Sequence, residues 1–244
     1  MFGTHHSKMI ILLRHDDAAQ VIIHTANMIP RDWKNMTQAV WRSPPLPLLR
    51  DGESEGDGLL RVGSGEKFKA DLLTYLRAYD RRRITCKPIT DALAKYNFSS
   101  VKGTLIASVP GRHNIRDDES PRWGWVAMKQ ALRTIPVQEG KAEIVVQISS
   151  IATLGPTDNW LRNTLFSALS SHRGAASQKP GFKVIFPTAD EIRRSLDGYA
   201  SGASIHAKIQ SPQQAKQLQY LKPIFCHWAN DARDGSSKPP GVLV

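Results

Sequence analysis

The sequence predicts an α/β fold built from layers of sheet and helix. Short runs of apolar, often β-branched residues, such as residues 143–148, predict strands, because strands favour side chains of this type. Segments with apolar residues at helical spacing, such as residues 67–79, lie between these runs, and this alternation is typical of α/β layers. The 244 residues, 41% of them hydrophobic, are enough for one large core or two small ones.

The first predicted sheet comes from two apolar runs near the N-terminus. We expect residues 9–13 to form a buried strand and residues 20–24 to form a second strand. The turn-like sequence His15-Asp16-Asp17 separates the two runs. The following elements are a proline- and glycine-rich loop over residues 43–65, a helix over residues 67–79 and a helix over residues 90–96.

A second series of elements begins near residue 100. Its predicted members are a strand over residues 104–109, a helix over 125–132, a buried strand over 143–148, a helix over 158–169, a strand over 182–186, a helix over 188–196 and a helix over 212–229. Thr188 with Glu191 three residues later has the spacing of a capping box, which marks a helix start. We expect Pro223 to interrupt or kink the last helix.

The charge balance favours a polyanionic partner. The formal net charge is +11 and the sequence pI is about 9.8. Lysines and arginines that line a groove displace counterions from a phosphate backbone, so a nucleic acid is the partner that this surplus suggests. The alternative is a basic surface that only faces water.

Other ligands and settings receive no support from the sequence. Cys86 and Cys226 lie far apart and predict neither a disulfide framework nor a CxxC metal site. The histidines do not cluster with carboxylates or thiols at ligand spacing, so we expect no metal. No apolar run approaches the roughly 18 to 20 residues of a membrane-spanning helix, and we expect a soluble protein.

Three residues near the N-terminus suit phosphodiester chemistry. His6 and Lys8 are two apart, immediately before the run at residues 9–13, so in a strand they point to the same face. Asn27 follows the second run and is expected near the same end of the sheet. An imidazole can attack phosphorus, while an ammonium group and an amide hold its oxygens. The alternative for His6 is an ordinary histidine at a strand end.

The sequence blocks around these residues, and further blocks downstream, point to one protein family. The blocks are GTHHSKMIILL, VIIHTANMIPRDW, TQAVW, FKADLLTYLRAY, SVPGRH, VVQISSIATLGP and IFPTADEIRRSLDGYASGASI. Together they resemble the tyrosyl-DNA phosphodiesterase family, a branch of the phospholipase D superfamily, over nearly the whole chain. The superfamily pattern has an aspartate five residues after the lysine, where this chain has Leu13. The tyrosyl-DNA branch lacks that aspartate too, which disfavours the alternative of a phospholipid-cleaving relative.

The resemblance implies a fold, a reaction and a set of site residues. The fold would be a phospholipase D-like layered sheet-and-helix arrangement of two similar halves, both incomplete here, with residues 1–99 in the first and 100–244 in the second. The reaction would release tyrosine, or a tyrosyl peptide from a topoisomerase, from a DNA 3′ end in the nucleus, without a cofactor. The implied site residues are the nucleophile His6, Lys8 and Asn27 on the phosphate oxygens, Gln38 near the site, Phe2 stacked on a base, and Ser150 and Thr153 on the DNA.

The family also has a second HxK motif, which supplies the general acid for the leaving tyrosine. His206 and Lys208 spell HxK, but a helix start follows them where the first motif has a buried strand. We therefore expect His206 to be a loop residue and not the general acid. We also expect the chain to be truncated at both ends relative to the family. The rival to an enzyme is then a catalytically incomplete fragment that only binds nucleic acid or a partner.

Overall fold

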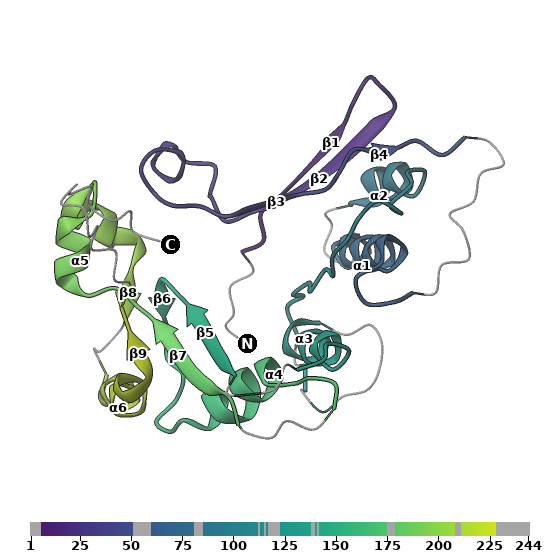
Figure 1. Ribbon diagram of the computed structural model, residues 1–244. Helices are drawn as coiled ribbons and strands as arrows, with labels where there is room; N and C mark the ends of the chain where they lie inside the picture. Colours follow the sequence, from purple (N-terminus) through teal and green to yellow (C-terminus); the bar gives the residue numbers. More distant parts are fainter. Residues whose placement is uncertain are drawn as a thin grey trace. The chain divides into compact units, whose positions relative to one another are not determined.

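The N-terminal sheet is built on the predicted hairpin. The computed structural model describes residues 6–50, 60–80, 85–111, 113–114, 116, 123–137, 140, 142–174, 179–207 and 211–227. Strand β1 (Met9–Leu13) pairs antiparallel with β2 (Ala18–His24), from Met9 opposite Ile23 to Leu13 opposite Ala19. Asp17 has a positive φ of 54° in the connecting turn, a conformation that aspartate tolerates better than most residues. Figure 1 shows this hairpin with its two short partner strands, β3 (Val40–Arg42) and β4 (Leu46–Pro47).

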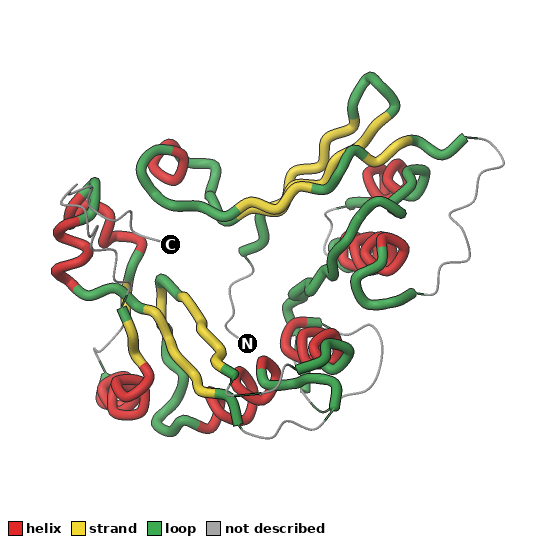
Figure 2. Tube along the Cα trace, viewed as in Figure 1, coloured by secondary structure: helices red, strands yellow, loops and turns green. Residues whose placement is uncertain are grey.

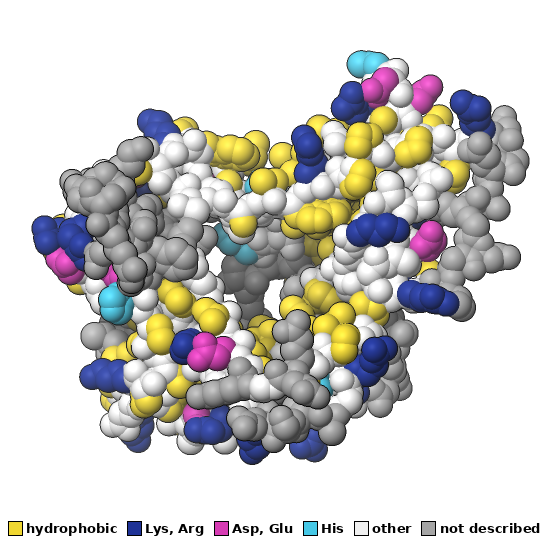
Figure 3. Space-filling view, viewed as in Figure 1, with side chains coloured by type: hydrophobic (Ala, Val, Ile, Leu, Met, Phe, Trp, Pro, Cys, Tyr) yellow, Lys and Arg dark blue, Asp and Glu magenta, His cyan; other side chains and the backbone are white. Residues whose placement is uncertain are grey.

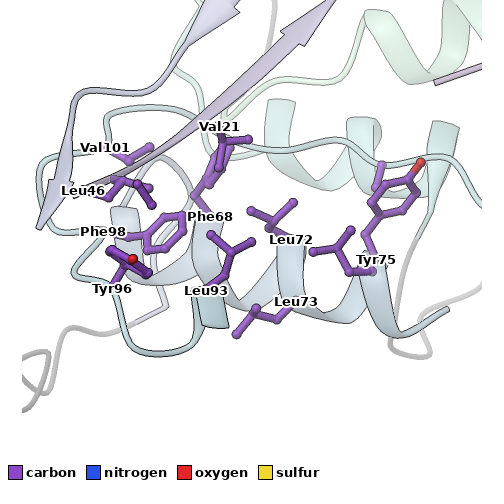
Figure 4. Close-up of a cluster of buried hydrophobic side chains, with 13 residues drawn as sticks. Val21, Leu46, Phe68, Leu72, Leu73, Tyr75, Leu93, Tyr96, Phe98 and Val101 are labelled. Atoms are coloured by element: carbon purple, nitrogen blue, oxygen red, sulfur yellow. The ribbon is translucent and has the colours of Figure 1, made fainter. Parts of the chain in front are cut away.

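The sheet packs on two helices through an apolar core. Helix α1 (Gly65–Arg77) directs Phe68 and Leu72 at Val21 of β2, and helix α2 (Lys87–Leu93) adds Leu93 to the same cluster (Figure 4). The side chain of Ser64 caps α1 by accepting a hydrogen bond from the Lys67 N–H at 3.2 Å. This core holds β2 in place, and β2 in turn carries β1.

Gly65 marks a close approach within this core. A Cβ at this position would lie 1.8 Å from the carbonyl oxygen of Phe98, a contact that only a glycine avoids without a shift of the backbone. The first turn of α1 therefore packs directly against the backbone near residue 98. Helix α3 (Gly124–Leu132) completes this part of the chain.

Several predictions for this region need correction. β1 is not a buried strand, since Leu12 and Leu13 are 40% and 48% exposed; its only partner among the described residues is β2. Residues 104–109 are not a strand either, and Figure 2 draws the described part of the chain between α2 and α3 as loop. Leu105 and Val109 nevertheless pack against the core. An apolar run predicts burial, and here burial occurs without strand pairing.

The C-terminal region contains a parallel sheet. Strands β5 (Glu143–Gln147), β7 (Gly181–Ile185) and β9 (Phe225–Cys226) pair in the order β5-β7-β9. β5 was expected to be buried, but Val145 is 56% exposed, because β5 pairs only with β7 in the described part of the chain. A second, two-stranded parallel sheet joins β6 (Ser150–Ile151) to β8 (His206–Ala207).

The helices of this region largely follow the sequence. The capping box of Thr188 and Glu191 is present at the start of α5. The last helix ends at Leu221, two residues before Pro223, and a 3-10 turn and β9 replace the predicted continuation to residue 229. The helical elements of the chain not yet given are the 3-10 helix η1 (Pro30–Trp33), the π-helix η3 (Leu161–Phe166), α4 (Ser167–Leu169), α5 (Ala189–Arg194), the 3-10 helix η4 (Gly198–Ser204), α6 (Pro212–Leu221) and the 3-10 helix η5 (Lys222–Ile224).

Contacts divide the chain into two compact units. Residues 1–25 and 40–135 form unit 1, and residues 26–39 and 136–244 form unit 2. The segment after β2 thus belongs to unit 2 and not to the sheet that precedes it. These units are defined by contacts, and the division into family halves at residue 100 stays a prediction. No described helix is long and apolar enough to cross a membrane.

Candidate functional site

In unit 1, His6 and Lys8 lead directly into β1. The His24 N–H donates to the Lys8 carbonyl at 3.2 Å, which extends the antiparallel pairing of β1 and β2 by one residue. The Lys8 ammonium donates to the carbonyl of His6 at 3.1 Å. The side chain of His6 is exposed and that of Lys8 half-buried. The backbone of the hairpin therefore positions this pair.

Both residues line one pocket of about 320 Å³. Its other walls include His24 and Tyr75 and the loop stretch from Leu105 to Ser108. The Tyr75 hydroxyl lies 2.9 Å from that of Tyr79. Burial, and then the hydrogen bond with Tyr75, raise the pKa of Tyr79 well above its usual value, so this phenol stays protonated near neutral pH. The pocket thus joins two imidazoles, those of His6 and His24, and the Lys8 ammonium group to an otherwise largely apolar wall.

The sequence analysis missed His24 as a pocket residue. In an antiparallel pair, directly opposite residues point to the same face of the sheet, so Lys8 and His24 share a face. The signal was present in the sequence. A turn centred on Asp16 pairs residue 8 with residue 24, so the two predicted strands and their turn already implied this neighbour.

In unit 2, a buried carboxylate holds Asn27. The backbone N–H and the side-chain Nδ2 of Asn27 both donate to Oδ2 of Asp32, at 2.7 and 2.8 Å. Asp32 is only 5% exposed. The indole N–H of Trp33 donates to the Asn27 carbonyl at 2.8 Å. Since Nδ2 carries two hydrogens and Asp32 takes one, the bond fixes the amide and is compatible with a second acceptor. The sequence analysis missed this contact of Asp32 with Asn27.

The predicted DNA-contacting residues Ser150 and Thr153 lie close together in the sequence of unit 2, Ser150 in β6 and Thr153 in the irregular connection that turns away after it. Ser150 and Thr153 are both exposed, and Ser150 belongs to β6, opposite His206 of β8. The Thr153 hydroxyl accepts a hydrogen bond from Nε2 of Gln214 at 2.9 Å. Their contacts with DNA stay a prediction.

The other residues with a predicted place or role are Gln38, Phe2 and His206. Gln38 is half-buried in the unit 2 segment after Asn27, and its role stays a prediction. Phe2 lies outside the described residues. His206 does not lie in a loop as expected, because its backbone pairs with Ser150 in a two-residue strand. The helix expected after it does begin, at Pro212. That His206 is not the general acid stays a prediction.

The face drawn in Figure 3 has no single basic patch, and the described residues contain no candidate metal site. Lysine and arginine side chains are scattered over the face drawn in Figure 3, several beside aspartate or glutamate, instead of gathering into one patch. Within the described ranges, no group of three or more histidines, cysteines or carboxylates has the geometry of a metal site.

Comparison with known proteins gives one consistent family. The family model described as tyrosyl-DNA phosphodiesterase matches residues 1–242. The chain is 30% identical to the probable tyrosyl-DNA phosphodiesterase of Caenorhabditis elegans, over 98% of this chain and 51% of that protein. It is also 30% identical to tyrosyl-DNA phosphodiesterase 1 of Drosophila melanogaster, over 99% of this chain and 41% of that protein. The chain thus spans between 41% and 51% of the length of these two relatives.

A solved structure supports the same fold. The crystal structure of the yeast tyrosyl-DNA phosphodiesterase matches with a TM-score of 0.63 and 19% identity, over 93% of this chain and 52% of that one. The predicted mixed α/β fold is confirmed at this level, as a match to about half of the yeast structure.

Proposed function

The chain belongs to the tyrosyl-DNA phosphodiesterase family, and from this premise we propose that it takes part in hydrolysis of the 3′-phosphotyrosyl bond between DNA and a topoisomerase-derived peptide. This would make it a DNA-repair phosphodiesterase of the nucleus. The observation that carries the proposal is the placement of His6 and Lys8 on one pocket, within the block that the family model matches. The finer fold proposed with it is phospholipase D-like, with two similar halves.

His6 is the proposed nucleophile. A neutral imidazole nitrogen attacks phosphorus, the bond between phosphorus and the tyrosyl oxygen breaks, and a phosphohistidine forms. The phenolate leaves with the electron pair of that bond and takes up a proton from a general acid. Because tyrosine has an ordinary pKa of about 10, this proton matters to the rate. Water then attacks the phosphohistidine, which releases the DNA 3′-phosphate and restores His6.

The neighbours of His6 would bind charge and position the substrate. The Lys8 ammonium would turn from the His6 carbonyl to the non-bridging phosphate oxygens, where negative charge builds in the transition state. Asn27, whose side-chain amide is held by Asp32, would donate a hydrogen bond to a phosphate oxygen of the substrate. Ser150 and Thr153 would contact the DNA backbone, and Gln38 and Phe2 would act near the substrate. Backbone contacts of this kind carry no base-sequence information.

Covalent trapping tests the nucleophile. The chain is mixed with a 5′-labelled oligonucleotide that carries either a 3′-phosphotyrosyl group or a 3′-(4-nitrophenyl) phosphodiester, and the label that stays on denatured protein is measured. The nitrophenol is a more acidic leaving group and depends less on a general acid. We expect an acid-labile, alkali-stable adduct on His6 with the nitrophenyl substrate, whether or not the tyrosyl substrate reacts.

Two variants make the result specific. His6→Ala should lose the adduct, while His15→Ala, an exposed histidine in the hairpin turn, should keep it. Adduct formation by His6→Ala would contradict the mechanism. Absence of any adduct with both substrates would favour the rival, a fragment that only binds nucleic acid or a partner.

A further inference from the structure

We infer that one face of helix α6 shapes the turn at residues 150–155 for phosphate binding, with Gln214 and Gln217 as positioning residues. Four hydrogen bonds join three α6 side chains to this turn, across 61 to 65 residues of sequence. The inference rests on the proposed function, because it takes Thr153 to be a contact for the DNA backbone. It goes further by naming what holds that contact in place.

Gln217 is the centre of the arrangement. Its side chain is fully buried, at 0% exposure. Oε1 accepts from the Leu154 N–H at 3.0 Å, and Nε2 donates to the Ala152 carbonyl at 3.1 Å. The side-chain amide therefore pairs with the backbone on both sides of Thr153, as a neighbouring strand would. Burying an amide is costly unless both of its ends are bonded, so this pairing selects one conformation of the turn.

Gln214 acts on Thr153 itself. Its Oε1 accepts from the Ser211 N–H at 3.1 Å in the capping box of α6, and its Nε2 donates to the Thr153 hydroxyl at 2.9 Å. A hydroxyl that accepts one bond still has its hydrogen to donate. Gln214 is thus held by the helix start and in turn orients the Thr153 O–H as a donor, the role needed to bind a phosphate oxygen.

Tyr220 binds the C-terminal end of the turn. Its hydroxyl donates to the Gly155 carbonyl at 3.0 Å. Gly155 has a φ of 106°, a conformation that residues with a side chain rarely adopt. Gln214, Gln217 and Tyr220 are three residues apart, so they form one stripe on α6. The stripe touches four successive residues of the turn, from Ala152 to Gly155.

This arrangement predicts that the stripe controls DNA affinity without contacting DNA. Thr153 remains exposed while the backbone on either side of it is bound. The ligand class is a phosphodiester oxygen, which the hydroxyl would bind by a neutral donor to a charged acceptor. Because a hydroxyl displaces no counterion, its loss should weaken binding without changing the salt dependence.

The first test compares Gln217→Met with Gln219→Met. Both replacements put an unbranched apolar side chain of similar length on α6, but Gln219 is exposed and only Gln217 bonds the turn. We measure the affinity of the chain for a single-stranded oligonucleotide with a 3′-phosphate, and its slope against salt. Gln217→Met should weaken binding about tenfold with an unchanged slope, the size of one or two hydrogen bonds. Gln219→Met should bind as the parent does.

A double-mutant cycle tests whether Gln214 acts through Thr153. Thr153→Val removes the hydroxyl at nearly constant volume, and Gln214→Met removes its donor. Each single variant should weaken binding by about five- to tenfold. If Gln214 works through the hydroxyl, adding Gln214→Met to Thr153→Val should cost almost nothing more. Additive losses would overturn this part of the inference.

The outcomes separate the inference from the proposed function. If the parent chain binds the oligonucleotide and Gln217→Met binds equally well with unchanged folding by circular dichroism, the inference is wrong and the function stands. If Gln217→Met unfolds unit 2, hydrogen exchange of the Leu154 amide is measured in the variants of the double-mutant cycle instead. Faster exchange in Gln214→Met would support the positioning role, and unchanged exchange would contradict it. A parent chain that fails to bind DNA would overturn the proposed function and the inference with it.

Discussion

The two segments proposed to bind phosphate are held in different ways. Residues 6–8 of unit 1 are positioned by backbone pairing, since the Lys8 carbonyl accepts from His24 and β1 pairs with β2 along its whole length. The turn at residues 150–155 of unit 2 is held by side chains from α6, one of which, Gln217, is fully buried. The first depends on a continuous hairpin and the second on contacts between distant parts of the sequence.

This difference teaches where each segment is vulnerable. Backbone hydrogen bonds between two strands are insensitive to most side-chain changes in those strands, but they are lost when the core beneath the strands is weakened. A turn held by a few side-chain amides fails when one amide is lost, even though the core stays intact. The following predictions separate these two kinds of support.

The largest effect is expected from Leu72→Ala in α1. Leu72 is fully buried beneath β2, so the substitution removes apolar contacts and leaves a cavity. We expect the free energy of unfolding to fall by about 3 kcal/mol. Leu13→Ala makes the same change at an exposed position of β1 and should cost less than about 1 kcal/mol. Urea unfolding of both variants, followed by circular dichroism, measures the difference, and equal losses would show that the hairpin does not depend on this core.

Lys8→Ala should lower the rate without disturbing the fold. The variant keeps the nucleophile His6 and the backbone pairing at Lys8, but it removes the cation proposed to stabilise the transition state. We expect adduct formation with the nitrophenyl substrate to slow by about 100-fold, with an unchanged unfolding midpoint. Lys8→Arg restores the charge and should recover part of the rate. A normal rate in Lys8→Ala would remove this residue from the site.

The smallest effect concerns Glu191, a second place in unit 2 where side chains hold the chain. Burial acts to raise its pKa, but the hydrogen bond that the Thr188 N–H donates to the carboxylate and the contact with His227 at 3.0 Å outweigh burial and lower the pKa. A carboxyl with a lowered pKa in the folded state stabilises the protein above its ordinary pKa of about 4.5, and this stability is lost as the pH falls through the folded value.

Glu191→Gln should therefore flatten the loss of stability as the pH falls from 7 to below the ordinary carboxyl pKa of about 4.5, while it lowers stability slightly at pH 7. The matched variant is Glu143→Gln, whose carboxylate pairs with Lys183 at an exposed position and should contribute little. Urea midpoints across this pH range measure both. An unchanged pH profile in Glu191→Gln would contradict the proposed role of this carboxylate.

The sequence by itself determined the local features of the fold. The apolar runs placed β1 at residues 9–13 and β2 within two residues of its start, because their pattern is local. The capping box fixed the start of α5, since both of its hydrogen bonds lie within four residues. The blocks around His6 and Lys8 identified the family, which the match over residues 1–242 confirms.

Only the tertiary structure decided which segments find partners. The apolar run at residues 104–109 packs on the core without strand pairing, and β1 and β5 are more exposed than their composition suggested. Both outcomes depend on which other strands lie alongside, and a local pattern does not contain that information. The same holds for Gln217, an ordinary glutamine in the sequence, whose burial against Ala152 and Leu154 depends on how the chain folds back over 65 and 63 residues.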